Sequence, residues 1–101
     1  MDNNEEKLMD TTEKKVLPLI KKYYSCFDKA GENFIGMFEA DTDMKAMRII
    51  EDAVNNPQAG LSKHPEDYTL FRILEIDMRT GQVIENEVKS IINAKELKSE
   101  S

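Results

Sequence analysis

The segment Tyr68–Asp77, with the sequence YTLFRILEID, constrains the fold more than any other part of this chain. Apolar or aromatic residues occupy both of its alternating sets of positions, which is typical of a strand in the middle of a sheet. A chain of 101 residues has room for one hydrophobic core, since such a domain buries roughly 60 to 70% of the surface exposed when unfolded. The sequence therefore predicts a single domain built around this strand.

Extended segments on both sides of the central strand predict further strands. Residues 19–28, within the stretch VLPLIKKYYSCF, are rich in β-branched and aromatic residues, and Pro18 suits the start of a strand. The polar DKAGEN, with Gly31 available for positive φ, then leads to FIGMFEA and predicts a β-hairpin. After the central strand, Gly81 suits a hairpin with a bulge, and VIE predicts a short fourth strand.

Residues 41–56 change period and predict an α-helix. Met44, Met47, Ile50 and Val54 recur at intervals of three or four residues, which places them on one face of a helix. Asp41 or Thr42 can cap the N-terminus by accepting a free backbone N–H, and the sequence NNP ends the helix because proline disfavours helical geometry in the residue before it.

The order hairpin, helix, hairpin predicts an α+β fold (ββαββ), with a small, four-stranded, mostly antiparallel sheet and one main helix on one face. Val88, Ile91, Ile92 and Leu97 follow at helical spacing, so a C-terminal helix is one reading of this segment, and an extension of the sheet by IIN is the other. We expect a flexible acidic arm at residues 1–15, a single α+β domain at residues 16–98 and a frayed tail at residues 99–101.

Composition excludes several classes of protein. The formal net charge of −6 argues against a surface coated with phosphate contacts. Cys26 is the single cysteine, which excludes an intrachain disulfide and suits a reducing cytoplasm. The chain has no apolar run near 18 residues, and its N-terminus is acidic where a secretory signal would be basic. We therefore expect a soluble protein that is neither exported nor bound to a membrane.

The residue types that support catalysis or metal binding are scarce. His64 lies beside Glu66 and Asp67, but a zinc site needs three or four ligands, and a Cys26–His64 nucleophile pair would lack an orienting third group. Neither GxGxxG nor GxxxxGK occurs. We expect a noncatalytic protein with no catalytic residues, no metal site and no cofactor, in which KHPED is a stiff entry to the central strand; the alternative is that Lys63 and His64 contact phosphate or a protein.

Basic and aromatic residues stand side by side in two predicted strands. Rings on a sheet can stack on bases while nearby cations hold the backbone of single-stranded nucleic acid. The alternative is that the rings belong to the core and the lysines extend around it. The candidate nucleic-acid-binding residues are Lys21, Lys22, Tyr23, Tyr24, Lys63, His64 and Arg72.

The stretch LSKHPEDY, at residues 61–68, and the TG of the turn that follows the central strand resemble the nonstructural protein family of gokushovirus-type single-stranded DNA phages (Microviridae). The segments YYSCFDKAGENF and EADTDMKAMRIIEDAVNNP are also similar, so that the resemblance extends over about residues 23–83. It implies a nonstructural phage protein in the cytoplasm of the infected bacterium, linked with viral DNA synthesis or its switch to packaging. It implies no established active site.

Two functions follow as expectations. The first is binding of single-stranded DNA, or of the phage or host replication machinery, through the sheet face left open by the helix. The second is an acidic protein-interaction or scaffold module that forms a homodimer or binds a phage or host protein without contacting DNA. A sheet face that is positive and aromatic would favour the first, whereas an apolar or acidic face would favour the second.

Overall fold

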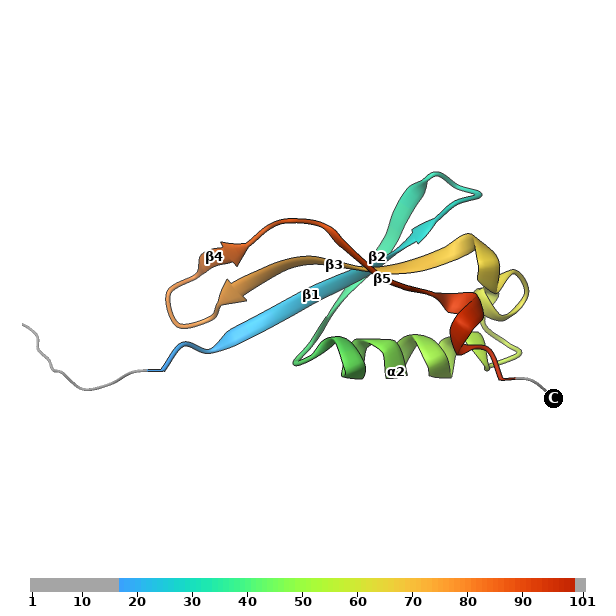
Figure 1. Cartoon of the computed structure of the whole chain (residues 1–101), viewed down its shortest axis with the longest axis horizontal. Coiled ribbons are helices and arrows are strands. Elements are labelled where there is room, and N and C mark those ends of the chain that lie inside the picture. The colour runs from blue at the N-terminus through green and yellow to red at the C-terminus, as the bar shows by residue number, and fades with distance from the viewer. Residues whose placement is uncertain (1–16, 100–101) are drawn as a thin grey trace, which may run out of the picture.

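A computed structural model describes residues 17–99 and contains five strands and one α-helix (Figure 1). The predicted arm at residues 1–15 lies outside the described residues, as do residues 100–101 of the predicted tail. The elements are β1 (Ile20–Asp28), β2 (Asn33–Ala40), α2 (Asp43–Val54), β3 (Tyr68–Asp77), β4 (Gln82–Glu85) and β5 (Lys89–Asn93), with short 3-10 helices at Gly60–Ser62, Pro65–Asp67 and Ala94–Leu97.

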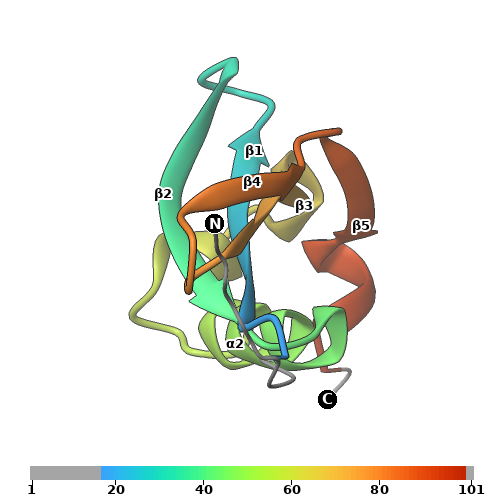
Figure 2. The same cartoon turned by 90° about the vertical axis from the view of Figure 1, so that its left-hand side faces the viewer.

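The strands form one antiparallel sheet in the order β2-β1-β3-β4, with β5 also pairing with β3. β3 lies at its centre, as predicted: β1 pairs along its full length on one side, while β5 and β4 share the other side. The α+β fold is therefore confirmed, with one main helix on one face (Figure 2).

Three details of the structure differ from the predicted fold. The sheet has five strands rather than four, because residues 89–93 pair with β3 and satisfy the backbone groups on its second edge. Of the two readings of the C-terminal segment, extension of the sheet by IIN is confirmed and a C-terminal α-helix is wrong, since residues 94–97 form only a 3-10 turn that is capped by the Asn93 side chain. In the first hairpin, Glu32 rather than Gly31 takes the positive φ, at 58°.

Helix α2 has the boundaries that its local chemistry requires. The side chain of Thr42, and not that of Asp41, accepts a hydrogen bond from the backbone N–H of Lys45 and caps the N-terminus. Ala46, Ile50 and Val54 are buried against the sheet. The predicted stripe is therefore confirmed for Met47, Ile50 and Val54, whereas its first member, Met44, is wrong: it is 66% exposed and lies outside the contact with the sheet.

The core lies between α2 and the half of the sheet above it. Tyr24 of β1, Leu70 of β3 and Val54 of α2 are its largest fully buried side chains. Cys26 belongs to the same buried cluster, so the even-numbered residues of β1 face the helix. The start of β1, the end of β3 and all of β4 extend past the N-terminus of α2 as a three-stranded arm (Figure 1).

Candidate functional site

The side of the sheet away from α2 combines apolar and aromatic residues with polar ones, among them Ser25, Thr69 and Ser90, and we call it the open face. Because Tyr24 and Cys26 point toward the helix, the alternate residues of β1 point the other way. Residues paired across neighbouring strands share a face, so the register extends this assignment to β2, β3 and β4. The apolar and aromatic residues of the open face are Tyr23, Phe27, Phe34, Phe71, Leu74, Ile76 and Val83.

Three phenylalanines form a cluster at the end of the open face above the core. The ring centroids of Phe27 and Phe34 are 5.1 Å apart, and those of Phe34 and Phe71 are 5.3 Å apart. Both contacts are edge-to-face, which is a favourable arrangement for aromatic rings. Phe34 nevertheless remains 42% exposed, so the cluster has a surface that a partner can cover.

The open face carries almost no free charge. Among the strand residues that the structure describes, Lys21 is the one cation whose register places it there, and its ammonium group lies 3.3 Å from Asp41 and 3.6 Å from Glu39. The hydrogen bond to Asp41 and the charges of both carboxylates raise the pKa of Lys21. Glu39 also accepts a hydrogen bond from the hydroxyl of Tyr23, at 3.3 Å. The charged groups on this side therefore neutralise one another.

Tyr24 and Arg72 lie on the opposite side, between the sheet and the start of α2. The Tyr24 hydroxyl donates to Oδ1 of Asp43 at 2.5 Å, while Nη1 of Arg72 donates to both carboxylate oxygens at 2.8 and 2.7 Å. Burial and the bond to Asp43 raise the pKa of Tyr24, and the same carboxylate raises the pKa of Arg72. These two residues join the helix to the sheet through Asp43, which binds the Tyr24 hydroxyl and Nη1 of Arg72. Nε of Arg72 is buried without a hydrogen bond among the described residues, 3.4 Å from Glu75.

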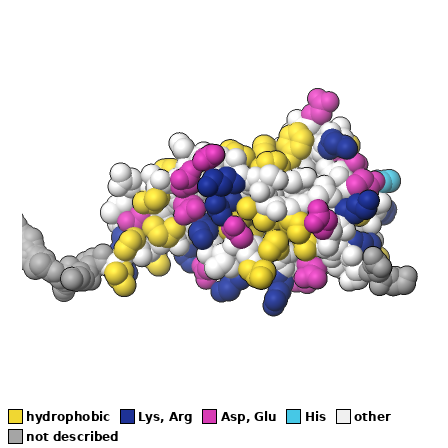
Figure 3. All heavy atoms as spheres, viewed as in Figure 1, with side chains coloured by type: hydrophobic (Ala, Val, Ile, Leu, Met, Phe, Trp, Pro, Cys, Tyr) yellow, Lys and Arg dark blue, Asp and Glu magenta, His cyan; other side chains and the backbone are white. Residues whose placement is uncertain are grey.

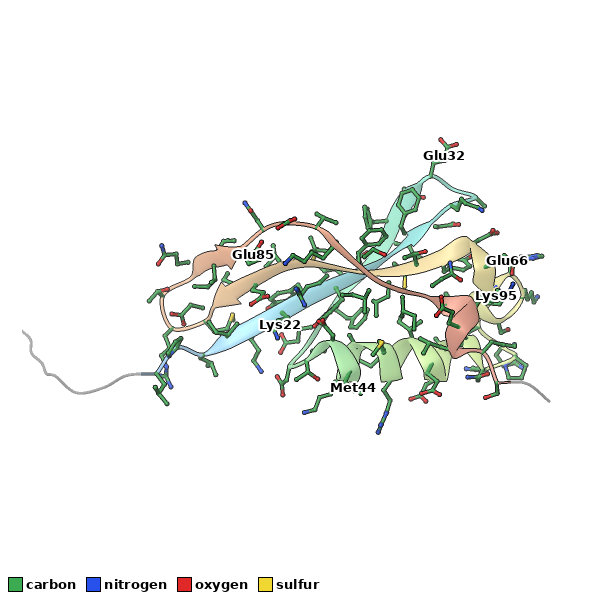
Figure 4. All side chains as sticks on the ribbon, viewed as in Figure 1. Lys22, Glu32, Met44, Glu66, Glu85 and Lys95 are labelled. Atoms are coloured by element: carbon green, nitrogen blue, oxygen red, sulfur yellow. The ribbon has the colours of Figure 1, made fainter. Side chains whose placement is uncertain are left out.

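The remaining candidate residues lie in other places. Lys22 pairs with Ala40 and Glu75, so it is on the helix side of the sheet. Lys63 and His64 are exposed in the loop before β3, where Nδ1 of His64 is 4.0 Å from Glu66. Figure 4 shows Glu66 at one end of the molecule and Lys22 near its middle. The structure does not bring the seven candidate residues together, and nucleic-acid binding by them stays a prediction.

The two residues considered for nucleophilic chemistry differ in exposure. Cys26 is 5% exposed, and burial raises the pKa of its thiol to about 11, so the thiol is protonated at neutral pH. The His64 side chain is 72% exposed. Within residues 17–99, no three side chains of His, Cys, Asp or Glu gather as a metal site would require. The expectation of a noncatalytic protein stays a prediction.

The apolar open face includes residues that were not among the sequence candidates, above all Leu74, Ile76 and Val83. Their orientation depends on an irregularity: Tyr23 pairs with Leu74, but Tyr24 pairs with Arg72, which leaves one extra residue in β3. As a result, odd-numbered residues of β3 lie on the open face before the bulge, and even-numbered residues lie on it after the bulge. The signal available in the sequence was the apolar character of both alternating sets in YTLFRILEID, which is consistent with two apolar faces.

Comparison with known proteins gives one match. A family model with the description "Phage ORF5 protein" matches residues 21–97, which covers the sheet, α2 and the loop that contains KHPED. No curated protein and no solved structure matches the chain. Among the described residues, no helix is long and apolar enough to span a membrane.

Proposed function

This chain belongs to the phage ORF5 protein family, and from that premise we propose that it is a noncatalytic phage protein that acts by binding another protein through its open face. The observation that carries the proposal is the composition of this face, which is apolar and aromatic with its charges paired. Contiguous apolar surface of this kind is typical of protein interaction sites.

The process in which the protein acts is proposed from its resemblance to gokushovirus nonstructural proteins, carried by the stretch LSKHPEDY. That resemblance supports a role in viral DNA replication, or in its switch to packaging, in the cytoplasm of the infected bacterium. The partner class includes phage and host replication proteins and a second copy of the chain.

Site-specific photocrosslinking in infected cells tests the proposal. A benzophenone amino acid in place of Phe34, which is 42% exposed on the open face, should give covalent adducts with protein. The matched control is the same amino acid in place of Met44, which is 66% exposed and points away from the sheet (Figure 4). Mass spectrometry identifies the adducts; protein adducts from position 44 but none from position 34 would contradict the proposal.

Single-stranded DNA is a second candidate partner because of the cluster formed by Phe27, Phe34 and Phe71. Rings on an open sheet can stack on bases, and each stacked base is worth about 1–3 kcal/mol. The paired state of Lys21 opposes this reading, because release of counterions from phosphate needs free cations.

Fluorescence anisotropy with labelled oligonucleotides at two salt concentrations separates the two partner classes. For a protein partner we expect no saturable binding of oligonucleotide at low salt. DNA would be established as the ligand of the open face by two results together. Binding would weaken as salt rises, and it would be lost in Phe34→Ser but kept in Met44→Ser.

A further inference from the structure

We infer that a second copy of this chain covers the open face, so that two sheets pack face to face around a twofold axis. The inference rests on the proposed function, since it names the protein that binds the same surface. Two sheets in face-to-face contact interdigitate their apolar side chains at a spacing of about 10 Å. A twofold contact of this kind requires a surface that is complementary to itself.

The charges of the open face meet this requirement. Lys21 and Glu39 are partners within one copy, so two open faces in contact would not oppose unpaired like charges. Two acidic residues of the arm, Glu75 and Glu85, lie on the other side of the sheet. In the strand register Glu75 is opposite Lys22 of β1 and opposite Glu85 of β4, which places both carboxylates on the helix side. The carboxylates of Glu75 and Glu85 are therefore directed away from the proposed contact.

The apolar surface also extends past the core, because the arm has no helix beneath it. Leu19 is 45% exposed, Met78 is 47% exposed and Val83 is 47% exposed, and all three belong to the arm or to the segments that adjoin it. Figure 3 shows hydrophobic side chains at the surface of this part of the molecule. A partner that covers the length of the sheet would remove these side chains from water.

The size of the open face is close to that required for a dimer. The nine residues of β1 span roughly 30 Å at about 3.3 Å per residue; at about 4.8 Å per strand, four strands span roughly 19 Å over the core and the three strands of the arm span roughly 14 Å. Each copy would then contribute about 500 Å² and the contact would bury about 1,000 Å² in total, at the lower end of the range expected of a biological interface.

The β2 edge of the sheet is a poorer contact than the open face. One edge of the sheet is β2, and β4 and β5 form the other. In β2 the register breaks between Ile35 and Phe38, and Gly36 takes a φ of +67°. A bulge of this kind twists an edge strand and opposes pairing with another strand. We therefore place the second copy on the open face rather than beside β2.

Light scattering and sedimentation of the full chain across a range of concentrations test the dimer. The wild-type protein should show twice the chain mass of 11.6 kDa. The substitution Val83→Lys places an unpaired charge in the contact and should raise the dimer dissociation constant by at least about tenfold. Met44→Lys, on the outer surface of α2, should leave that constant unchanged. Circular dichroism checks that each variant is folded.

The possible results separate this inference from the proposed function. A wild-type monomer at about 100 μM, well above the micromolar dissociation constants of weak specific complexes, would overturn the dimer. The dimer contact proposed here would also be overturned if Met44→Lys weakened the dimer and Val83→Lys left it unchanged. If the protein is monomeric but position 34 forms adducts with a phage or host protein, the dimer fails and the proposed function stands. A monomer whose position 34 forms adducts only with DNA would overturn both.

Discussion

Replacing Leu70 with alanine is expected to lower the free energy of unfolding by about 3 kcal/mol. Leu70 is fully buried near the middle of the sheet, where it pairs with Cys26 on one side and Ile92 on the other. Its side chain belongs to the cluster that includes Val54 of α2, so truncation removes contacts with both layers. The cost combines the lost transfer of apolar atoms from water with the cavity that remains.

Urea titration at one fixed protein concentration measures this loss, because self-association would make apparent stability depend on concentration. Ile49→Ala is the control: Ile49 is 45% exposed on α2, outside the core, and alanine favours a helix. We expect this control to lie within about 0.5 kcal/mol of wild type. Equal losses from the two substitutions would mean that Leu70 does not occupy the core described here.

The central strand and the helix could be predicted because their sequences allow one interpretation. Tyr68–Asp77 is apolar on both alternations, and the structure has β3 at these residues in the middle of the sheet. The stripe of Met47, Ile50 and Val54 has the period of a helix, and these residues pack against the sheet. In both segments, local propensity and tertiary packing favour the same structure.

The fifth strand could not be decided from sequence because Ile91 and Ile92 suit a helix face and a strand about equally. Residues 89–93 become a strand because the edge of β3 at Leu70 and Phe71 is available for pairing, and this edge exists only in the folded domain. The faces of β3 were also beyond prediction, because one bulged residue reverses the alternation and does not change the composition of the strand.

The candidate site was only partly predictable for a similar reason. Tyr24 and Arg72 resemble surface groups available to a ligand, yet both bind Asp43, which lies 19 residues after Tyr24 and 29 before Arg72. No short-range pattern reports a pairing over such distances in sequence. The sequence indicated the sheet face without the helix as the place to look for function, and this stays a prediction. The apolar residues of that face favour the second of the two expected functions.

Replacing Asp43 with alanine is the second large change that we expect, with a loss of about 2 kcal/mol in the free energy of unfolding. The substitution leaves Nη1 of Arg72 and the hydroxyl of Tyr24 without their acceptor. Removal of one partner from a buried ion pair costs about 3–5 kcal/mol. The smaller figure applies because the Asp43 side chain is 37% exposed, although that of Arg72 is only 14% exposed.

Asp41→Ala is a matched control two residues away. The Asp41 side chain is 56% exposed and its ion pairs with Lys21 and Lys45 are at the surface, where such pairs contribute little to stability. Urea titration at pH 7 should therefore show a much smaller loss for Asp41→Ala than for Asp43→Ala. Similar losses would mean that the cluster of Tyr24, Asp43 and Arg72 contributes no more than a surface pair.

The pH dependence of the Asp43→Ala effect gives an independent check. Burial opposes ionisation of Asp43, but the hydrogen bonds from Tyr24 and Arg72 and the charge of Arg72 outweigh it, so the pKa of this carboxyl is lowered. A lowered pKa in the folded state means that the ionised carboxylate stabilises the fold fully above its ordinary pKa of about 4. That contribution is lost as pH falls through the lower pKa of the folded state. The difference between wild type and Asp43→Ala should be constant near neutral pH and shrink below about pH 4, whereas an unchanged difference down to pH 2 would show that Asp43 acts through packing and not through its charge.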